Sequence, residues 1–155
     1  MAEAKSFFEA LEDTLVARVK RAAPQARVEP WPDSPAEFFR PQVANAIYLR
    51  IGDLLPQLTD QQSPAPFIQV ARLEVEVRIL LKNLRTHVGT YASKESIFTA
   101  LSGYVPASNE TYIFKHPGLQ LIRSGMIERR DQSAQWDWGL KFSAPLNLLT
   151  ERTDL

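Results

Sequence analysis

The sequence contains no cysteine among its 155 residues. This absence excludes disulfide bonds, thiolate metal sites, thiol nucleophiles and thiol-based redox switches, and it fits a protein kept in a reducing compartment. Net charge is also missing, because 18 lysine and arginine residues balance 18 aspartate and glutamate residues. Proteins that bind nucleic-acid backbones usually carry a basic excess or a basic patch. The overall charge therefore does not favour a nucleic-acid-binding role.

Long hydrophobic runs and targeting segments are absent as well. No apolar stretch approaches the roughly 20 residues that span a bilayer. The first 15 residues carry acidic side chains inside their apolar pattern, unlike a signal peptide. We therefore expect a soluble protein without membrane contact. The length of 155 residues predicts one domain with one hydrophobic core.

Motifs that carry catalysis are scarce. The six glycines are scattered singly, so the sequence has no glycine-rich phosphate loop. His87 and His116 are far apart in sequence, and neither has a neighbour of metal-ligand type. No serine lies in the context of a hydrolase nucleophile, and no pair of acids stands out. We therefore expect a protein that is not an enzyme and that binds no cofactor and no metal.

The apolar pattern predicts the elements of the first half of the chain. Residues 4–23 repeat apolar side chains at steps of three and four, which is typical of an amphipathic helix. Five of the 11 prolines fall in residues 24–41, so this segment can hold only a short edge strand and a single helical turn. Alternation predicts a strand over residues 44–51. Residues 52–66 show neither period and are expected to form a long loop.

The second half begins with the clearest strand pattern of the chain, over residues 67–82, where apolar and charged residues alternate. The pattern over residues 93–102 predicts a second helix, with Ser93 as its cap and Gly103 at its end. Residues 118–143 are typical of a hairpin, and residues 146–155 of a polar tail. This order favours an α+β fold, with an antiparallel or mixed sheet and two helices packed on one face.

Two groups of residues are candidates for contacts with other proteins. One face of the long strand carries Arg72, Glu74, Glu76 and Arg78. It is either a solvated surface with cross-strand ion pairs or an interface between subunits, in which alternating charge fixes register and partner choice. The second group lies in the expected loop over residues 52–66 and comprises Asp53, Gln57, Asp60, Gln61 and Gln62.

The tryptophans Trp136 and Trp138 are two residues apart and therefore share one strand face. Such a pair is more often core beneath a helix than a ligand platform. Exposed rings could stack on single-stranded nucleic acid, but the basic groove that should accompany them is missing from the neighbouring sequence. We therefore expect both rings to belong to the core.

The segment LSGYVPASNETYIFKHPGLQLIRSGMIERRDQSAQWDWGLKFSAP, from Leu101 to Pro145, resembles small morphogenesis proteins of Mu-like transposable bacteriophages and prophages. These proteins are encoded between the capsid and tail genes. The N-terminal half is similar to them only in the order of its elements. Long-tailed phages place a tail terminator or a head-to-tail joining protein in this gene region, and the predicted element order is similar to the tail terminator fold.

The resemblance implies a structural virion protein of the neck or tail, assembled in the host bacterial cytoplasm. It implies a homo-oligomeric ring, commonly a hexamer, that caps the tail tube, stops its growth and docks to the head. The partners would be further copies of the chain, the tail tube protein and a head-completion or connector protein, with DNA only as cargo passing through the lumen. The alternatives are another neck protein and a small regulatory nucleic-acid-binding protein.

Overall fold

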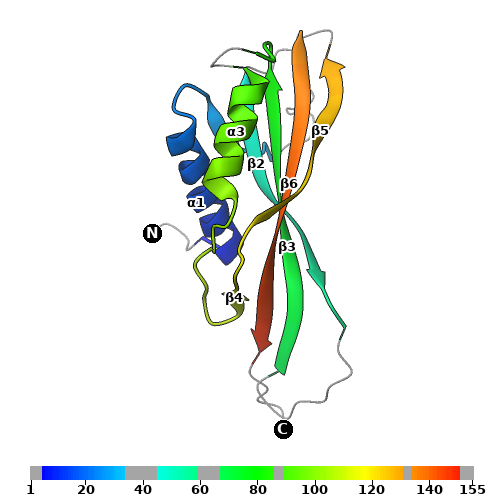
Figure 1. Ribbon diagram of the computed structural model, residues 1–155. Coiled ribbons are helices and arrows are strands. Elements are labelled where there is room, and N and C mark those ends of the chain that lie inside the picture. Colours follow the sequence, from blue (N-terminus) through cyan, green and yellow to red (C-terminus); the bar gives the residue numbers. More distant parts are fainter. Residues whose placement is uncertain (1–4, 34–44, 59–66, 86–88, 131–133, 151–155) are drawn as a thin grey trace.

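The computed structural model describes residues 5–33, 45–58, 67–85, 89–130 and 134–150 (Figure 1). In these ranges the chain forms two helices and six strands. They are α1 (Phe7–Ala22), β1 (Val28–Pro30), β2 (Ala46–Pro56), β3 (Phe67–Leu81), α3 (Thr90–Leu101), β4 (Tyr112–Phe114), β5 (Gln120–Arg130) and β6 (Gln135–Thr150).

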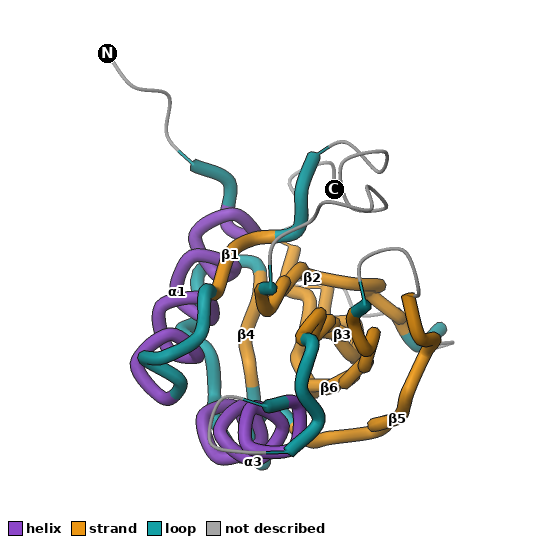
Figure 2. The backbone as a smooth tube through the Cα atoms, turned by 90° about the horizontal axis from the view of Figure 1, so that it is seen from above, coloured by secondary structure: helices purple, strands orange, loops and turns teal. Residues whose placement is uncertain are grey.

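The strands form one mixed sheet in the order β1, β2, β3, β6, β4, with β5 also paired to β6. β1 runs parallel to β2, and the other pairs are antiparallel. β5 and β4 follow each other along the same side of β6, β5 beside residues 135–143 and β4 beside residues 146–148. Both helices lie on one side of the curled sheet (Figure 2), which confirms the predicted α+β fold.

The hydrophobic core lies between the helices and the sheet. β3 runs between β2 and β6 and turns Leu73, Val75, Val77 and Ile79 inward, each at most 1% exposed. The alternation in the sequence predicts this pattern, because successive side chains of a strand point to opposite faces. The helices and β6 supply the facing side chains: Leu11, Leu15, Val19, Ile97, Leu101, Leu140, Phe142 and Leu146.

α1 begins where the sequence offers a cap. The Ser6 hydroxyl accepts a hydrogen bond from the Glu9 backbone N–H at 3.1 Å, and this satisfies one of the free donors of the first turn. Lys20 and Arg21 lie in the last turn, where positive charge complements the helix dipole. The helix therefore matches the predicted one to within a few residues at each end.

α3 begins three residues earlier than predicted, so Ser93 is not its cap. The cap position is occupied by Gly89, and Ser93 is buried inside the helix. A side chain at position 89 would not fit, since its Cβ would lie 2.1 Å from the Arg85 carbonyl oxygen. Gly103 follows the helix with φ of +77°, the left-handed conformation expected of it.

β2 corrects the expected loop over residues 52–66, because the strand continues through Pro56. The register of β2 against β3 shifts between Ile51 and Leu54. This irregularity interrupts the alternation of apolar and polar residues from which a strand is predicted. Pro56 is tolerated because it ends a strand at the edge of the sheet, where no further donor is needed. Residues 59–66 of the expected loop lie outside the described residues.

β6 corrects the expected polar tail over residues 146–155, because the strand runs through Pro145 to Thr150. Leu146 is fully buried. Pro145 lies between Ser143, where pairing with β5 ends, and Leu146, where pairing with β4 begins. Its missing N–H therefore falls in a gap between two neighbours, which explains why a proline continues a central strand here.

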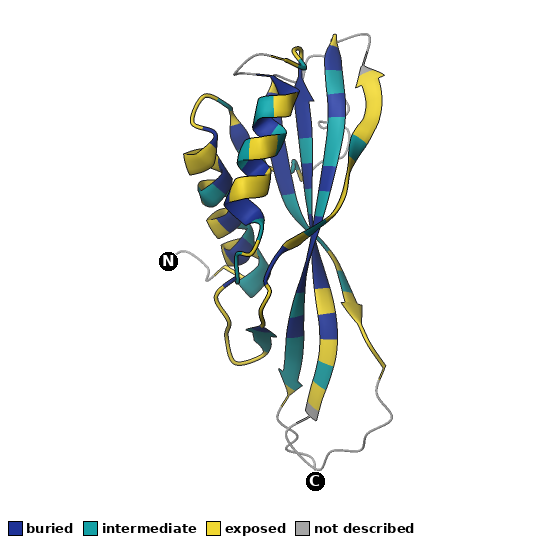
Figure 3. Ribbon diagram, in the orientation of Figure 1, coloured by how far each residue is buried: buried dark blue, intermediate teal, exposed yellow. Residues whose placement is uncertain are grey.

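The far ends of β2, β3 and β6 extend past the two helices (Figure 1). We call residues 52–58, 67–70 and 147–150 the arm. Its described residues are exposed or half-buried, whereas the sheet beneath the helices is largely buried (Figure 3). The arm therefore projects from the packed part of the molecule, which covers it only in part, at Leu54 and Leu148.

Val77→Asp should lower the free energy of unfolding by several kcal/mol, because it places an unpaired carboxylate in the core. Val77 is 0% exposed, whereas Val70 on the same strand is 49% exposed. Val70→Asp is therefore the matched control and should melt close to the wild type. Thermal unfolding followed by circular dichroism measures both, and equal melting temperatures for the two variants would contradict the assigned strand faces.

Glu12 predicts a pH-dependent effect on stability. Partial burial raises the pKa of its carboxyl, nearby Asp13, Asp33 and Glu9 raise it further, and a hydrogen bond with the Ile51 backbone opposes them. A carboxyl whose pKa is raised by folding destabilises the protein once it ionises. This penalty is absent below the pKa of the unfolded chain, about 4.3, and complete above the raised pKa of the folded chain.

Glu12→Gln should therefore raise the melting temperature at about pH 7 and leave it unchanged at about pH 3. Melting curves at both pH values, with Glu110→Gln in an exposed loop as control, test this expectation. A gain that persists undiminished at the lower pH would show that ionisation is not its cause.

Candidate interaction surfaces

Among the described residues, no group of three or more histidine, cysteine, aspartate or glutamate side chains could hold a metal ion. Within the same ranges, no helix has both the length and the apolar character needed to cross a membrane. His87 lies outside the described residues, and His116 precedes a cis proline at position 117. The candidates for a functional site are therefore charged and apolar surfaces, most of them on the sheet.

The charged face predicted on β3 lies on the side of the sheet away from the helices, and we call it the outer face. The guanidinium Nη2 of Arg50 on β2 lies 2.6 Å from the Glu76 carboxylate. From the other side, the Lys141 ammonium on β6 lies 3.5 Å from Glu76 and 3.8 Å from Glu74. Three strands thus contribute alternating charges to one ladder.

The remaining predicted residues also have partners in their own chain. Arg78 forms an ion pair with Asp137, whose side chain is fully buried. The Arg72 Nε donates a hydrogen bond to the Ser143 hydroxyl at 2.9 Å. The structure therefore brings Arg72, Glu74, Glu76 and Arg78 together on one face, in cross-strand contacts that are partly buried.

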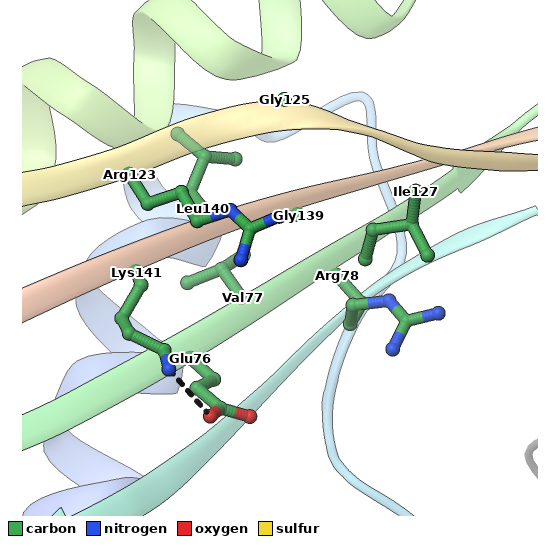
Figure 4. Close-up of a pocket in the computed structure, with 9 residues that line it drawn as sticks. All are labelled: Glu76, Val77, Arg78, Arg123, Gly125, Ile127, Gly139, Leu140 and Lys141. Carbon is green, nitrogen blue, oxygen red and sulfur yellow. Dashed lines mark ion pairs between the residues drawn. The ribbon is translucent and has the colours of Figure 1, made fainter.

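The outer face is hollowed beside β5. Gly125 and Gly139 are direct partners on β5 and β6, and a Cβ on Gly139 would lie 2.8 Å from Ile127 Cδ1. The Ile127 side chain occupies that space, and a notch of about 280 Å³ opens between it and Arg123 (Figure 4). Within the described part of the chain, Arg123 has no ion-pair or hydrogen-bond partner. The notch thus combines an apolar wall with an uncompensated cation.

Large hydrophobic side chains are exposed in two places among the described residues. The first is the arm surface, which consists of Leu55, Leu58, Ile68 and Val70. The second is the β5 surface, which consists of Ile122, Met126 and Ile127 on β5 and Tyr91 and Phe98 on α3. Each of these side chains is at least 41% exposed. Clustered exposure of this kind marks interaction sites more often than scattered exposure does.

The β5 surface surrounds an edge strand. In the described ranges β5 pairs only with β6, and its register shifts around Ile122 and again around Ile127. Each shift leaves one extra residue on β5 that has no paired residue on β6. Ile122 and Ile127 are these extra residues. Between β5 and α3 lies a second groove of about 510 Å³, lined by Phe98, Leu121 and other residues.

Trp138 lies beside this groove. Its ring meets the Tyr91 ring of α3 edge to face at 6.3 Å, and the Lys94 ammonium lies 4.3 Å from the ring centre. The indole N–H donates to the Ser124 hydroxyl at 3.2 Å. Trp138 therefore packs beneath a helix, as predicted. Trp136 is half-buried and carries the Arg129 guanidinium over its ring.

Of the loop residues predicted to contact a partner, two lie among the described residues and three lie outside them. Asp53 is exposed and lies in β2, within the arm. The Gln57 backbone N–H donates to the Val70 carbonyl at 2.8 Å, so this residue extends the pairing of β2 with β3. Asp60, Gln61 and Gln62 lie outside the described residues. The sequence did not reveal the arm or the β5 surface, although the run Ile122–Ile127 contains three apolar residues in a strand that ends in charged ones.

The chain is similar to known proteins over most of its length. A family model described as Gp37 protein matches residues 15–153. No curated protein matches at a significant level. Among solved structures, the chain is similar to one chain of the virion of a native gene transfer agent (GTA) particle, with 14% identity and a TM-score of 0.48. That alignment covers 92% of this chain and 99% of the other.

Reversing one charge of the ladder should destabilise the subunit itself. Glu76→Arg sets a third cation beside Arg50 and Lys141, and we expect the free energy of unfolding to fall by about 1–3 kcal/mol. Adding Arg50→Glu should recover part of this loss, because it restores one opposite-charge pair. Urea unfolding of the wild type, the single variant and the double variant measures the effect. A single variant as stable as the wild type would contradict an ordered ladder.

Proposed function

The chain belongs to the Gp37 protein family, and we propose that it serves as a structural protein of a phage virion. The role that we propose in particular is that of a tail terminator. In this role, six copies of the chain, the number that the resemblance implies, form a ring at the head-proximal end of the tail tube. The similarity of residues 101–145 to phage morphogenesis proteins is the first support for this proposal.

The observation that carries the proposal is the presence of two separate apolar surfaces, on the arm and around β5. A protein that acts alone rarely keeps several large hydrophobic side chains exposed in clusters, because water makes such clusters unfavourable. A subunit of an assembly needs such surfaces, one for each kind of contact. The exposed side chains therefore favour a function that depends on protein contacts.

The proposed mechanism is the control of assembly. A ring subunit adds to the last tube ring through one face, and its opposite face lacks the surface that another tube subunit recognises. Growth then ends, and the free face is available to the head-completion or connector protein. DNA passes through the lumen as cargo.

The outer face has a proposed role in this mechanism. Its charges are already held in place by contacts within the subunit, as in the Arg50–Glu76 and Arg78–Asp137 pairs. A partner with the complementary pattern would therefore be selected without a large cost in side-chain ordering. We propose that Arg72, Glu74, Glu76 and Arg78 contact a neighbouring subunit in this way, and that Asp53 and Gln57 of the arm contact a partner.

Deleting the gene tests the proposed role. In particles released by the strain that encodes the chain, we expect tails of irregular length without attached heads, and a plasmid copy should restore uniform tails. Electron microscopy of negatively stained particles measures tail length, and a tagged copy should locate the protein at the head-proximal tail end. Headless tails of uniform length would indicate another neck protein instead. Intact particles would rule out a virion role.

A further inference from the structure

We propose that the arm surface of one copy of this chain docks onto the β5 surface of a second copy. The contact deepens the proposed ring function and rests on it for its biological purpose, but it can be tested on the purified protein. Four observations support it: the distribution of exposed hydrophobic side chains, the distance between the two surfaces, an unpaired charge beside each of them, and the strand edge that each includes.

The two surfaces account for all the exposed large hydrophobic side chains of the described residues. The arm surface presents aliphatic side chains only, with Leu58 at 89% the most exposed. The β5 surface presents aliphatic, methionine and aromatic side chains beside two hollows, the notch at Ile127 and the groove at Phe98. A projecting apolar group and a hollowed apolar surface are the two halves of a well-packed interface.

The arm cannot cover the β5 surface of its own chain. Met126 pairs with Trp138, which in turn pairs with Ile79 of β3. Val70 lies nine residues away from Ile79 along the same strand, a separation of about 30 Å in an extended strand. Figure 1 shows the arm and β5 at opposite ends of the sheet. Since each surface is too far from the other within one subunit, a second copy is the occupant that brings them together.

One exposed charge beside the arm surface is complementary to one beside the β5 surface. Asp53 is exposed in the arm, and Arg123 is exposed between Ile122 and the notch. Neither has an ion-pair or hydrogen-bond partner within the described parts of the chain. Docking of the arm onto β5 would bring an uncompensated anion toward an uncompensated cation, and such complementarity selects the correct partner.

The backbone adds to this complementarity. β2 beyond Leu49 pairs only with β3, and β5 pairs only with β6, as far as the described ranges extend. Both surfaces therefore include a strand edge with free donors and acceptors, and such edges readily pair with another chain.

Two variants that each disable one surface test the proposal. Val70→Glu introduces a carboxylate on the arm surface, and Met126→Glu introduces one on the β5 surface. Both positions are about half exposed, so both variants should fold with wild-type melting curves. In sedimentation velocity experiments we expect each to weaken self-association about tenfold or more. Ala107→Glu, at an exposed loop position outside both surfaces, is the matched control and should associate like the wild type.

Mixing the two variants gives the decisive result. The intact β5 surface of Val70→Glu can still receive the intact arm of Met126→Glu, so the mixture should form one-to-one dimers at concentrations at which each variant alone is monomeric. Native mass spectrometry identifies such dimers by mass. A mixture that associates no better than either variant alone would overturn the proposal, because the intact arm and the intact β5 surface would then have failed to dock. A wild-type protein that is monomeric at about 1 mM would overturn it as well.

The outcomes separate this contact from the proposed function. If mixing restores association while deletion of the gene leaves tails and heads intact, the contact stands and the virion role falls. If tails become irregular although the wild type is monomeric, the virion role stands and the contact falls. A wild type that forms closed dimers and nothing larger supports the contact and contradicts the ring.

Discussion

Fifteen consecutive residue pairs join β3 to β6, and every other element is placed by this ladder. β2 and β1 extend the sheet from the β3 side, while β5 and β4 follow each other along the far side of β6. The two helices cover only the part of the ladder that buries residues such as Val77 and Phe142. Because the ladder is longer than the helix layer, the arm projects from it, and the same long strands that build the core also build the arm surface.

The ladder also explains the state of the outer face. On each strand of an antiparallel pair, alternate residues face away from the core, so opposite charges on β2, β3 and β6 meet across the strands. Glu76 lies between Arg50 and Lys141 for this reason, and Arg78 reaches the buried Asp137. These charges are therefore not free to rearrange around an arbitrary partner. Their fixed pattern favours specificity in an assembly more than strength, since contacts of this kind exchange solvation for pairing at little net gain.

The sequence predicted the parts of this structure that depend on local pattern. The strict alternation over residues 67–81 identified β3 and its buried face, and the helical repeat identified α1. It failed where tertiary contacts override local signals: Pro56 and Pro145 continue strands because of the gaps and edges around them, and Ser93 is buried where a cap was expected. The candidate residues Arg72 to Arg78 were found together because they share one strand. Their partners Arg50, Asp137 and Lys141 could not be foreseen, since no sequence pattern fixes the register between distant strands.

The charges of the outer face are already paired within the subunit, so they contribute selectivity to a contact more than strength. The described ranges also expose apolar surface in two places, and a charge without a partner lies beside each, Asp53 at the arm and Arg123 at β5. Because the two surfaces differ, a contact between them is directional, and each subunit that docks presents a new surface for the next one. Such growth stops only when the rotation between neighbours closes a ring. In the proposed ring, the curl of the sheet that Figure 2 shows is the feature of this fold that would set that rotation.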